Sequence, residues 1–279
     1  MSSTIYPCLW FNGEAKTAAN FYCSVFKDSK ITADTPMVVN FELSGQKFMG
    51  LNGGPQFIMN PSISFFVVLE TESETDEAWR KLSAGGKVLM PLDKYDWSEK
   101  YGWVQDRFGL SWQLSFGKLE DVGQVFTPML MFTGKQQGRT KEAIEYYKTF
   151  FDNSAVIGIM EYDARENEKP GFVKHAQFKL NGYIMMAMDS SGPHAFSFNE
   201  AISLVVECRD QKEIDHYWEK LNDGGEESRC GWVKDRFDIW WQVVPEVLGK
   251  LMSDPSRSER VMQAFMQMKK FDIEKLENA

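Results

Sequence analysis

The sequence predicts an α+β protein built from two tandem copies of one domain, followed by a C-terminal helix. Three observations support this prediction: a long internal repeat, a strand–helix–hairpin order within each copy, and an amphipathic segment after the second copy. The repeat is clearest where Tyr101–Leu114 (YGWVQDRFGLSWQL) aligns with Cys230–Val243 (CGWVKDRFDIWWQV), with eight of fourteen positions identical. Two of the identical positions are tryptophan, the rarest kind of match, so the alignment indicates duplication.

Further alignments fix the extent of the two copies. Ser62–Glu70 (SISFFVVLE) aligns with Ala201–Arg209 (AISLVVECR), and the opening strings YPCLWFNG and FYCSVF align with TPMLMFTG and YYKTFF. We place copy one at residues 1–119 and copy two at residues 124–250. Copy one has an insertion of ten residues around Pro91–Lys100, and its part near Asp93–Lys100 is a candidate lid.

The first half of copy one predicts a strand, a helix and a hairpin. Tyr6–Phe11 is a short apolar run that ends at Asn12-Gly13, which is typical of a strand followed by a turn. Ala15–Phe26 places its apolar residues at helical spacing. Val38–Leu43 and Lys47–Leu51 flank Ser44-Gly45 and indicate a hairpin.

The second half repeats this order. Ser62–Leu69 is a predicted strand, and Thr75–Ala84 is a predicted helix that ends at Gly85-Gly86. Gly102–Gln105 and Ser111–Phe116 are predicted strands on either side of a turn. Each copy therefore holds two strand–helix–hairpin units, and the chain holds four.

The segment after the repeats predicts an amphipathic helical tail at residues 251–279. Apolar residues at 261, 265, 266, 268 and 271 share one face of a helix. Its methionine stripe indicates packing against the body of the protein more than a partner-binding face.

Composition excludes several classes of protein. The 279 residues carry 40 acidic and 31 basic side chains, a net charge of −9, which gives no electrostatic reason to bind nucleic acid or an anionic membrane. No apolar run approaches the roughly 20 residues of a membrane span, and the start of the chain shows no signal-peptide pattern. The four cysteines form no CxxC pair. We therefore expect a cytoplasmic protein with reduced thiols.

These residues also resemble a known family. The strings GWVQDRFGLSWQL, FNGEAKTAANFYCSVF and NPSISFFVVL, together with the tail RVMQAFMQMKKFDIEKLENA, are similar to the PhnB-like proteins. That family is often labelled "3-demethylubiquinone-9 3-methyltransferase" and belongs to the glyoxalase, bleomycin-resistance and extradiol-dioxygenase superfamily, also called vicinal oxygen chelate. The resemblance implies tandem glyoxalase/bleomycin-resistance-like domains, each with two βαβββ units that form a half-open barrel around a ligand. It also implies an internal pseudo-dimer, and leaves a further homo-oligomer open.

The methyltransferase label finds no support in the sequence. S-adenosylmethionine enzymes usually need a glycine-rich turn between a strand and a helix, and no G-x-G-x-x-G follows any predicted strand here. The strand–helix–hairpin order also lacks the alternation of a doubly wound sheet. We expect no methyl transfer and no cofactor.

The metal pattern of the superfamily is also missing at most positions. Metal-dependent members are known for inward His, Gln or Glu side chains on the first strand of each unit and on late strands. Carried onto this chain, those positions fall near Pro7, Pro128, Ser64, Ser203, Gln113, Gln242, Gly50 and Ala187. Only the two glutamines are plausible ligands, so we expect no metal site.

His175 is the one candidate catalytic residue. It lies in the predicted strand VKHAQFKL, where it would serve as a base or ligand within the barrel, or as a hydrogen-bonded strand histidine without a chemical role. His194 and His216 are expected on the surface.

The repeat also places an Asp-Arg pair at one turn of each copy, as Asp106-Arg107 and Asp235-Arg236. A matched pair at a tight turn more often fixes the turn than carries chemistry. We expect an ion pair and turn hydrogen bonds at both places.

Five residues are candidates for lining the ligand site. Strand alternation favours an inward side chain for the two glutamines, with Trp112 and Trp241 packed under helices. Trp103 and Trp232 begin late strands, where they would either stack on a planar ligand or pack in the core, and Trp10 lies on the first strand. The ligand-binding candidates are Trp10, Trp103, Gln113, Trp232 and Gln242.

Three functions remain open from the sequence. The leading one is metal-independent binding of an unidentified small organic molecule in an aromatic-lined cup. The second is an enzyme of the same superfamily, either a metal-dependent lyase, isomerase or dioxygenase, or a metal-free variant that uses His175 with Gln242 and a carboxylate such as Asp189 or Glu161. The third is a degenerate scaffold whose cups are filled by their own side chains.

Overall fold

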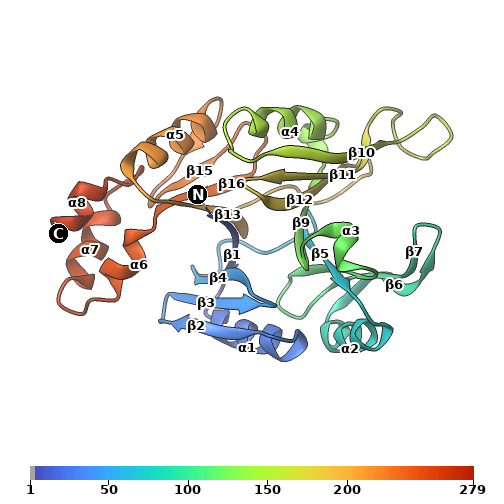
Figure 1. Cartoon of the computed structure of the whole chain (residues 1–279), viewed down its shortest axis with the longest axis horizontal. Helices are drawn as coiled ribbons and strands as arrows, with labels where there is room; N and C mark the ends of the chain where they lie inside the picture. Colours follow the sequence, from blue (N-terminus) through green and yellow to red (C-terminus); the bar gives the residue numbers. More distant parts are fainter. Residues whose placement is uncertain (1–3) are drawn as a thin grey trace.

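A computed structural model describes residues 4–279 of the chain. Its four strand–helix–strand units follow one another along the sequence (Figure 1). Unit 1 comprises β1 (Thr4–Phe11), α1 (Ala15–Val25), β2 (Lys30–Asp34), β3 (Val38–Leu43) and β4 (Gln46–Asn52). Unit 2 comprises β5 (Ile63–Leu69), α2 (Glu72–Ser83), β6 (Lys87–Tyr95), β7 (Ser98–Gln105) and β8 (Ser111–Phe116).

Copy two repeats this plan after a short helix, α3 (Leu119–Val122). Unit 3 comprises β9 (Phe126–Phe132), a 3-10 turn (Gly134–Gln136), α4 (Thr140–Lys148), β10 (Ala155–Glu161), β11 (Val173–Leu180) and β12 (Tyr183–Asp189). Unit 4 comprises β13 (Ile202–Cys208), α5 (Gln211–Asn222), β14 (Glu226–Glu227), β15 (Trp232–Lys234) and β16 (Trp240–Pro245). The predicted α+β class and the tandem order of units are confirmed.

The strands form two sheets of eight, and each sheet joins one unit of each copy. Sheet A has the order β14-β15-β16-β13-β1-β4-β3-β2, and sheet B has the order β10-β11-β12-β9-β5-β8-β7-β6. Antiparallel pairs at the centre make the junctions: Tyr6 of β1 lies opposite Val205 of β13, and Phe66 of β5 lies opposite Thr127 of β9. The half-open barrels are thus assembled across the copies, and not from the two units within a copy.

Two crossing loops hold the sheets in this arrangement. The segment before β5 and the segment before β13 run side by side, because Asn60 donates to the Ser197 carbonyl and Asn199 donates to the Ile58 carbonyl, each at 3.0 Å. The junction also protects the first strand of each unit, whose second edge would otherwise lie open to other chains.

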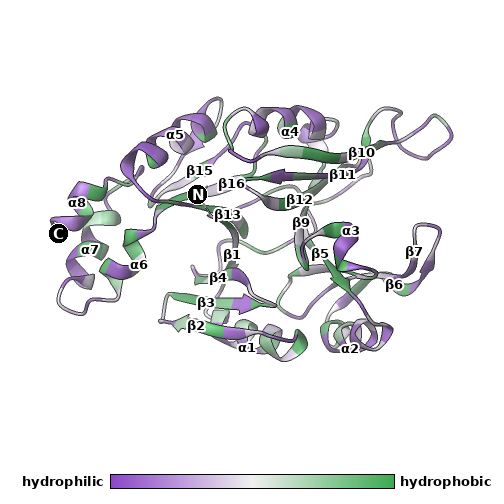
Figure 2. Ribbon diagram, viewed as in Figure 1, coloured by the Kyte–Doolittle hydropathy of each residue, from purple (hydrophilic) through white to green (hydrophobic). Residues whose placement is uncertain are grey.

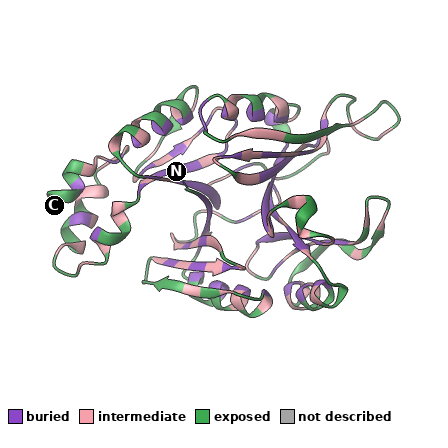
Figure 3. Cartoon of the chain, viewed as in Figure 1, coloured by how far each residue is buried: buried purple, intermediate pink, exposed green. Residues whose placement is uncertain are grey.

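Helices α1, α2, α4 and α5 cover the outer faces of the two sheets. Helices α1 and α5 pack on sheet A, while α2 and α4 pack on sheet B (Figure 1). Helix α1 buries Ala15, Ala18, Ala19 and Tyr22, a stripe at helical spacing. The outward helix surfaces are largely hydrophilic (Figure 2), and the central strands are the most buried part of the molecule (Figure 3).

The C-terminal tail contains three short helices: α6 (Val247–Met252), α7 (Ser258–Phe265) and α8 (Ile273–Glu277). The continuous apolar helix face predicted as far as residue 271 is wrong, because α7 ends at Phe265. Beyond it the backbone pairs with the segment between β14 and β15 of unit 4, where the Cys230 amide donates to the Met268 carbonyl at 2.8 Å. Phe271 is 2% exposed, so the tail packs against the body as expected.

The repeated Asp-Arg turns are structural, as expected, although the expected Asp-Arg ion pair is wrong. Asp235 is 1% exposed and accepts hydrogen bonds from the amides of Phe237 and Ile239 and from the Trp241 indole. Arg236 turns away and pairs with Asp223. Asp106 makes the equivalent bonds to Phe108, Leu110 and Trp112 in copy one. Each buried carboxylate therefore ties its turn to a tryptophan of the strand that follows.

Candidate ligand-binding sites

Alternation along the strands gives each sheet a helix-facing side and an inner face. The helix-facing side chains, such as Leu9, Phe65, Trp112 and Trp241, belong to the main core. The inner face is the opposite one, turned away from the helices. On sheet A it carries Tyr6, Cys8, Trp10, Met49, Ser203, Val205, Glu207, Trp232, Trp240 and Gln242. On sheet B it carries Ser64, Phe66, Tyr101, Trp103, Gln113, Thr127, Met129, Met131, His175, Met186 and Met188.

The floor of inner face A is a small polar cluster. The Gln242 amide donates to the Ser203 hydroxyl at 2.9 Å, and Cys8 lies opposite Ser203 across the central strand pair. Burial raises the pKa of the Cys8 thiol to about 12, although hydrogen bonds from Gln242 and Ser203 act in the opposite direction. Cys8 therefore stays protonated at neutral pH and is a poor nucleophile.

Aromatic rings border this floor on one side. The Trp10 ring lies 6.1 Å from that of Trp232, which lies 6.2 Å from that of Trp240. The Trp10 indole donates to the Gly54 carbonyl at 2.7 Å. Gly53 allows this position, since a Cβ atom there would lie 2.1 Å from the Trp10 ring.

A charged pair closes the opposite end of inner face A. Lys47 contacts Glu207 at 2.9 Å and lies 4.0 Å from the centre of the Tyr6 ring. Burial, followed by the charge of Glu207, raises the pKa of the Tyr6 hydroxyl. Inner face A thus offers stacking surfaces at one end, an ion pair at the other, and uncharged polar atoms between them.

Inner face B has a related floor with more hydrogen bonds. Gln113 accepts from the Tyr101 hydroxyl and donates to the Ser64 hydroxyl, each at 2.8 Å. The Trp103 indole donates to Ser111 at 2.7 Å. The inward orientation expected for Gln113 and Gln242 is therefore the one found, although their amide groups are already partnered by side chains of the floor.

Beyond this floor, inner face B is rich in methionine. Met129 lies opposite Met186 and Met131 lies opposite Met188 on adjacent strands. The Thr127 hydroxyl is fully buried and has no hydrogen-bond partner among the residues described.

His175 also belongs to inner face B. It is half-buried on β11, where it lies opposite Met160 of β10. Burial lowers the pKa of its imidazole, so the ring is neutral at pH 7.

The predicted lid is the hairpin of β6 and β7, which borders inner face B. Tyr95 stacks on Trp97 with ring centres 5.0 Å apart, and both rings contact Tyr101. Trp97 is 64% exposed. Tyr101 therefore links an exposed aromatic pair to the Gln113 floor.

The structure groups the predicted site residues by sheet and not by copy. Trp10, Trp232 and Gln242 share inner face A, while His175, Trp103 and Gln113 share inner face B. The predicted meeting of His175 with Gln242 is therefore wrong, because the two residues belong to different sheets.

The carboxylates expected beside His175 are engaged elsewhere. Asp189 is buried and accepts from the amide of Gly138 and the hydroxyl of Thr140 near the start of α4. Glu161 pairs with Lys141 at 2.6 Å. The other two histidines, His194 and His216, are exposed, as expected.

The donor set on the inner faces does not fit a divalent-metal centre. Pro7 and Gly50 lie on the helix-facing side, and the inner positions beside them are Cys8 and Met49. The two floors offer a thiol, thioethers, hydroxyls and neutral amides. Within residues 4–279, no group of three or more His, Cys, Asp or Glu side chains is placed to hold a metal ion.

The fold and these faces define a class: paired βαβββ units that form two half-open barrels. A family model described as 3-demethylubiquinone-9 3-methyltransferase matches residues 3–115 and 124–244. The chain belongs to this family.

Two solved structures are similar to this chain. A PhnB protein from Bacillus cereus, described as a putative 3-demethylubiquinone-9 3-methyltransferase, is 37% identical over 39% of this chain and 96% of its own, with a TM-score of 0.38. Glyoxalase I from Zea mays is 10% identical over 90% of this chain and 96% of its own, with a TM-score of 0.58. The second match shows that the tandem arrangement has the glyoxalase I fold. No curated protein matches the chain, and no helix of residues 4–279 is long and apolar enough to cross a membrane.

Proposed function

We propose that the protein binds compact, uncharged aromatic molecules on its inner faces without a metal. The observation that carries this proposal is the lining of both faces by indole rings, thioethers and uncharged hydrogen-bonding groups, with the Lys47–Glu207 pair of inner face A at the end opposite the indole rings. Such a lining favours burial of a planar apolar body and a few directed hydrogen bonds.

We also propose that the family label does not describe the reaction of this chain. Neither sheet is doubly wound, and within residues 4–279 no glycine-rich turn connects a strand to a helix in the manner of dinucleotide and nucleoside sites. A metal-dependent reaction is disfavoured by the donor chemistry of the floors. An enzymatic role would rest on His175 alone, without a neighbouring carboxylate to orient it.

The test uses 1-naphthol as the probe in titration calorimetry and thermal-shift measurements on the full chain. We expect binding that weakens in Trp103→Ala for inner face B and in Trp232→Ala for inner face A. Trp79→Phe is the control, because Trp79 lies on α2 near Gly102, away from both inner faces. Equal binding by all four proteins would contradict the proposal.

Metal content provides an independent test of the metal-free part. We expect no stoichiometric metal in tag-free protein purified without chelator. About one equivalent of Zn, Fe, Mn or Ni per chain would overturn the metal-free proposal and would favour the hypothesis of a metal-dependent enzyme.

A scaffold role is the second candidate, and one observation favours it. Inner-face side chains are themselves largely buried: Gln113 is 5% exposed and Met129 is 4% exposed. If no neutral aromatic probe binds either face, the barrels are filled by their own side chains and the scaffold role stands.

A further inference from the structure

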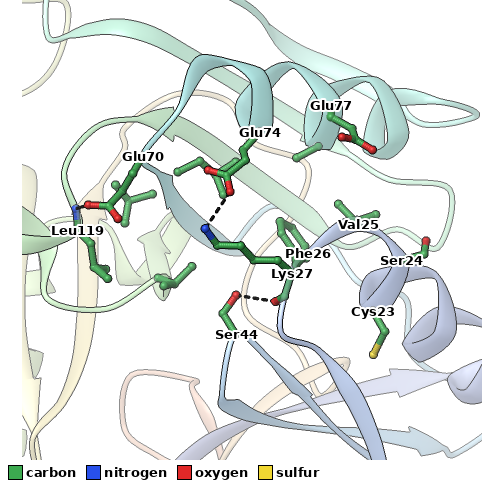
Figure 4. A pocket seen from close by; sticks show the side chains of 14 residues that line it. Cys23, Ser24, Val25, Phe26, Lys27, Ser44, Glu70, Glu74, Glu77 and Leu119 are labelled. Atoms are coloured by element: carbon green, nitrogen blue, oxygen red, sulfur yellow. Dashed lines mark hydrogen bonds and ion pairs between the residues drawn. The ribbon is translucent and has the colours of Figure 1, made fainter.

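A cavity of about 410 Å³ lies between α1 and α2, outside both inner faces. Its apolar lining includes Val25, Phe26, Leu69 and Ala78. Charged side chains surround its opening (Figure 4). A volume of this size is within the range of small-molecule sites, which begins at roughly 300 Å³.

The internal repeat shows why this cavity exists in copy one. Val25 aligns with Phe150, and Ala78 aligns with Tyr217. In copy two these aromatic residues fill the equivalent cleft between α4 and α5, where Phe150 is 5% exposed and Tyr217 is 3% exposed.

The filling side chains of copy two are held by neighbouring residues. Tyr217 packs near Phe151, with ring centres 5.1 Å apart, and accepts a hydrogen bond from Asn181 at 3.0 Å. A ring nitrogen of His216 lies 2.9 Å from the Phe150 carbonyl.

The partners of these side chains are also replaced in copy one. The counterparts of His216 and Asn181 are Glu77 and Ser44, which both line the cavity. Copy one has thus replaced a packed aromatic group by open space with a polar rim.

The rim carries more negative than positive charge. Glu70, Glu74 and Glu77 line the cavity together with one cation, Lys27. Lys27 pairs with Glu74 at 2.8 Å across the opening (Figure 4), and Lys81 pairs with Glu77 at 2.9 Å. Hydrogen bonds from these lysines lower the pKa of Glu74 and Glu77, so both are ionised at neutral pH.

Glu70 differs from Glu74 and Glu77, the two carboxylates of this rim that pair with lysines. One of its oxygens accepts from the Leu119 amide at 3.1 Å, and it pairs with no lysine or arginine among residues 4–279. Its counterpart in copy two is Arg209, which pairs with Glu213. The substitution of arginine by glutamate reverses the charge at the place where the aromatic filling is missing.

We propose that the cleft between α1 and α2 binds a small organic amine, whose apolar body occupies the space filled by Phe150 and Tyr217 in copy two and whose ammonium group pairs with Glu70. Apolar burial supplies most of the affinity and the carboxylate selects the sign of charge. This site is separate from the inner faces, so this proposal can be correct or wrong independently of the proposed function.

The test is titration calorimetry of the full chain with phenethylamine, 2-phenylethanol and phenylacetate, which share a ring and differ in charge. We expect binding in the order cation, neutral, anion, with the cation preference weakened by salt. The proposal would be overturned if phenylacetate bound as tightly as phenethylamine. It would also be overturned if none of the three ligands gave heat at concentrations up to about 10 mM, which covers weak affinities.

Variants locate the site. Val25→Phe with Ala78→Tyr transplants the side chains of copy two, and we expect it to reduce phenethylamine affinity about tenfold or more by filling the cavity. Glu70→Gln changes one exposed side chain and should fold normally. We expect it to weaken the amine by about two- to fivefold and to leave 2-phenylethanol unchanged.

Circular dichroism confirms that each variant is folded before it is titrated. Trp103→Ala and Trp232→Ala are the controls for the inner faces and should bind phenethylamine as the wild type does. Unchanged amine binding in both Glu70→Gln and the double variant would place the amine elsewhere and refute the site.

Discussion

Asp235 allows a quantitative prediction about stability and pH. Its carboxylate is buried and accepts from the amides of Phe237 and Ile239 through one oxygen, and from the Trp241 indole and the Tyr147 hydroxyl through the other. Four donors favour the charged form, whereas burial disfavours it. Burial is the larger effect and raises the pKa of Asp235 from 3.8 to about 6.

The direction of the pH effect follows from this raised pKa. Between pH 4 and 6 the folded protein holds a proton on Asp235 that the unfolded chain has lost. The contribution of Asp235 to the free energy of unfolding is therefore fully present below about pH 4, and it is lost as pH rises through about 6. The pKa difference corresponds to about 3 kcal/mol.

Asp235→Asn removes the titrating carboxyl group, so comparison of this variant with the wild type isolates the effect of Asp235 on stability. We expect the wild type to lose about 3 kcal/mol relative to Asp235→Asn as pH is raised from 4 to 7, measured by urea unfolding at several pH values. Tyr147→Phe removes one donor and should move the transition to higher pH. The reasoning would be refuted if the free energy of unfolding of the wild type, relative to that of Asp235→Asn, stayed constant or increased as pH is raised. Such a result would show that burial does not outweigh the four donors.

Two further predictions follow from the fold. Gly53→Ala should displace the Trp10 indole and break its 2.7 Å hydrogen bond to the Gly54 carbonyl. We expect the free energy of unfolding in urea to fall by about 1–3 kcal/mol and the tryptophan emission to shift. A variant with wild-type stability and emission would contradict the close contact. Copy one expressed alone as residues 1–119 should form dimers or aggregate in gel filtration, because β1 and β5 lose β13 and β9 as partners. A folded monomer of copy one would show that the cross-copy pairing is dispensable.

Local signals predicted most of the elements. The spacing of Ala18, Ala19 and Tyr22 predicts α1, and Ser44-Gly45 predicts the hairpin of β3 and β4. The exposed strands β2 and β10 lacked a clear signal, since edge strands bury little apolar surface and have weak alternation. The α7 helix ends early because backbone pairing with Cys230 competes with helix continuation.

The candidate site was predictable only in part. Alternation correctly gives the inward direction of Gln113 and Gln242, since period two is a local property of strands. The engagement of Asp189 at α4 is not visible in sequence, because its partners Gly138 and Thr140 lie about fifty residues away.

The cavity between α1 and α2 was also missed by the sequence analysis. The replacement of Phe150 and Tyr217 by Val25 and Ala78 was present in the alignment of the copies. The alignment does not show that these two positions meet in space, because they lie on different helices of each copy. Only the packing of α1 beside α2 turns two small side chains into one cavity.

The sequence by itself determined the repeat, the four units, the order of their strands and helices, and the family. These follow from spacing and composition over short stretches of chain. Tertiary structure alone decided that unit 1 pairs with unit 4 and unit 2 with unit 3, and so placed Trp10 with Gln242 and His175 with Gln113. The four first strands have similar apolar patterns, so local sequence does not distinguish their possible partners. The choice depends on the crossing loops and on packing across the whole chain.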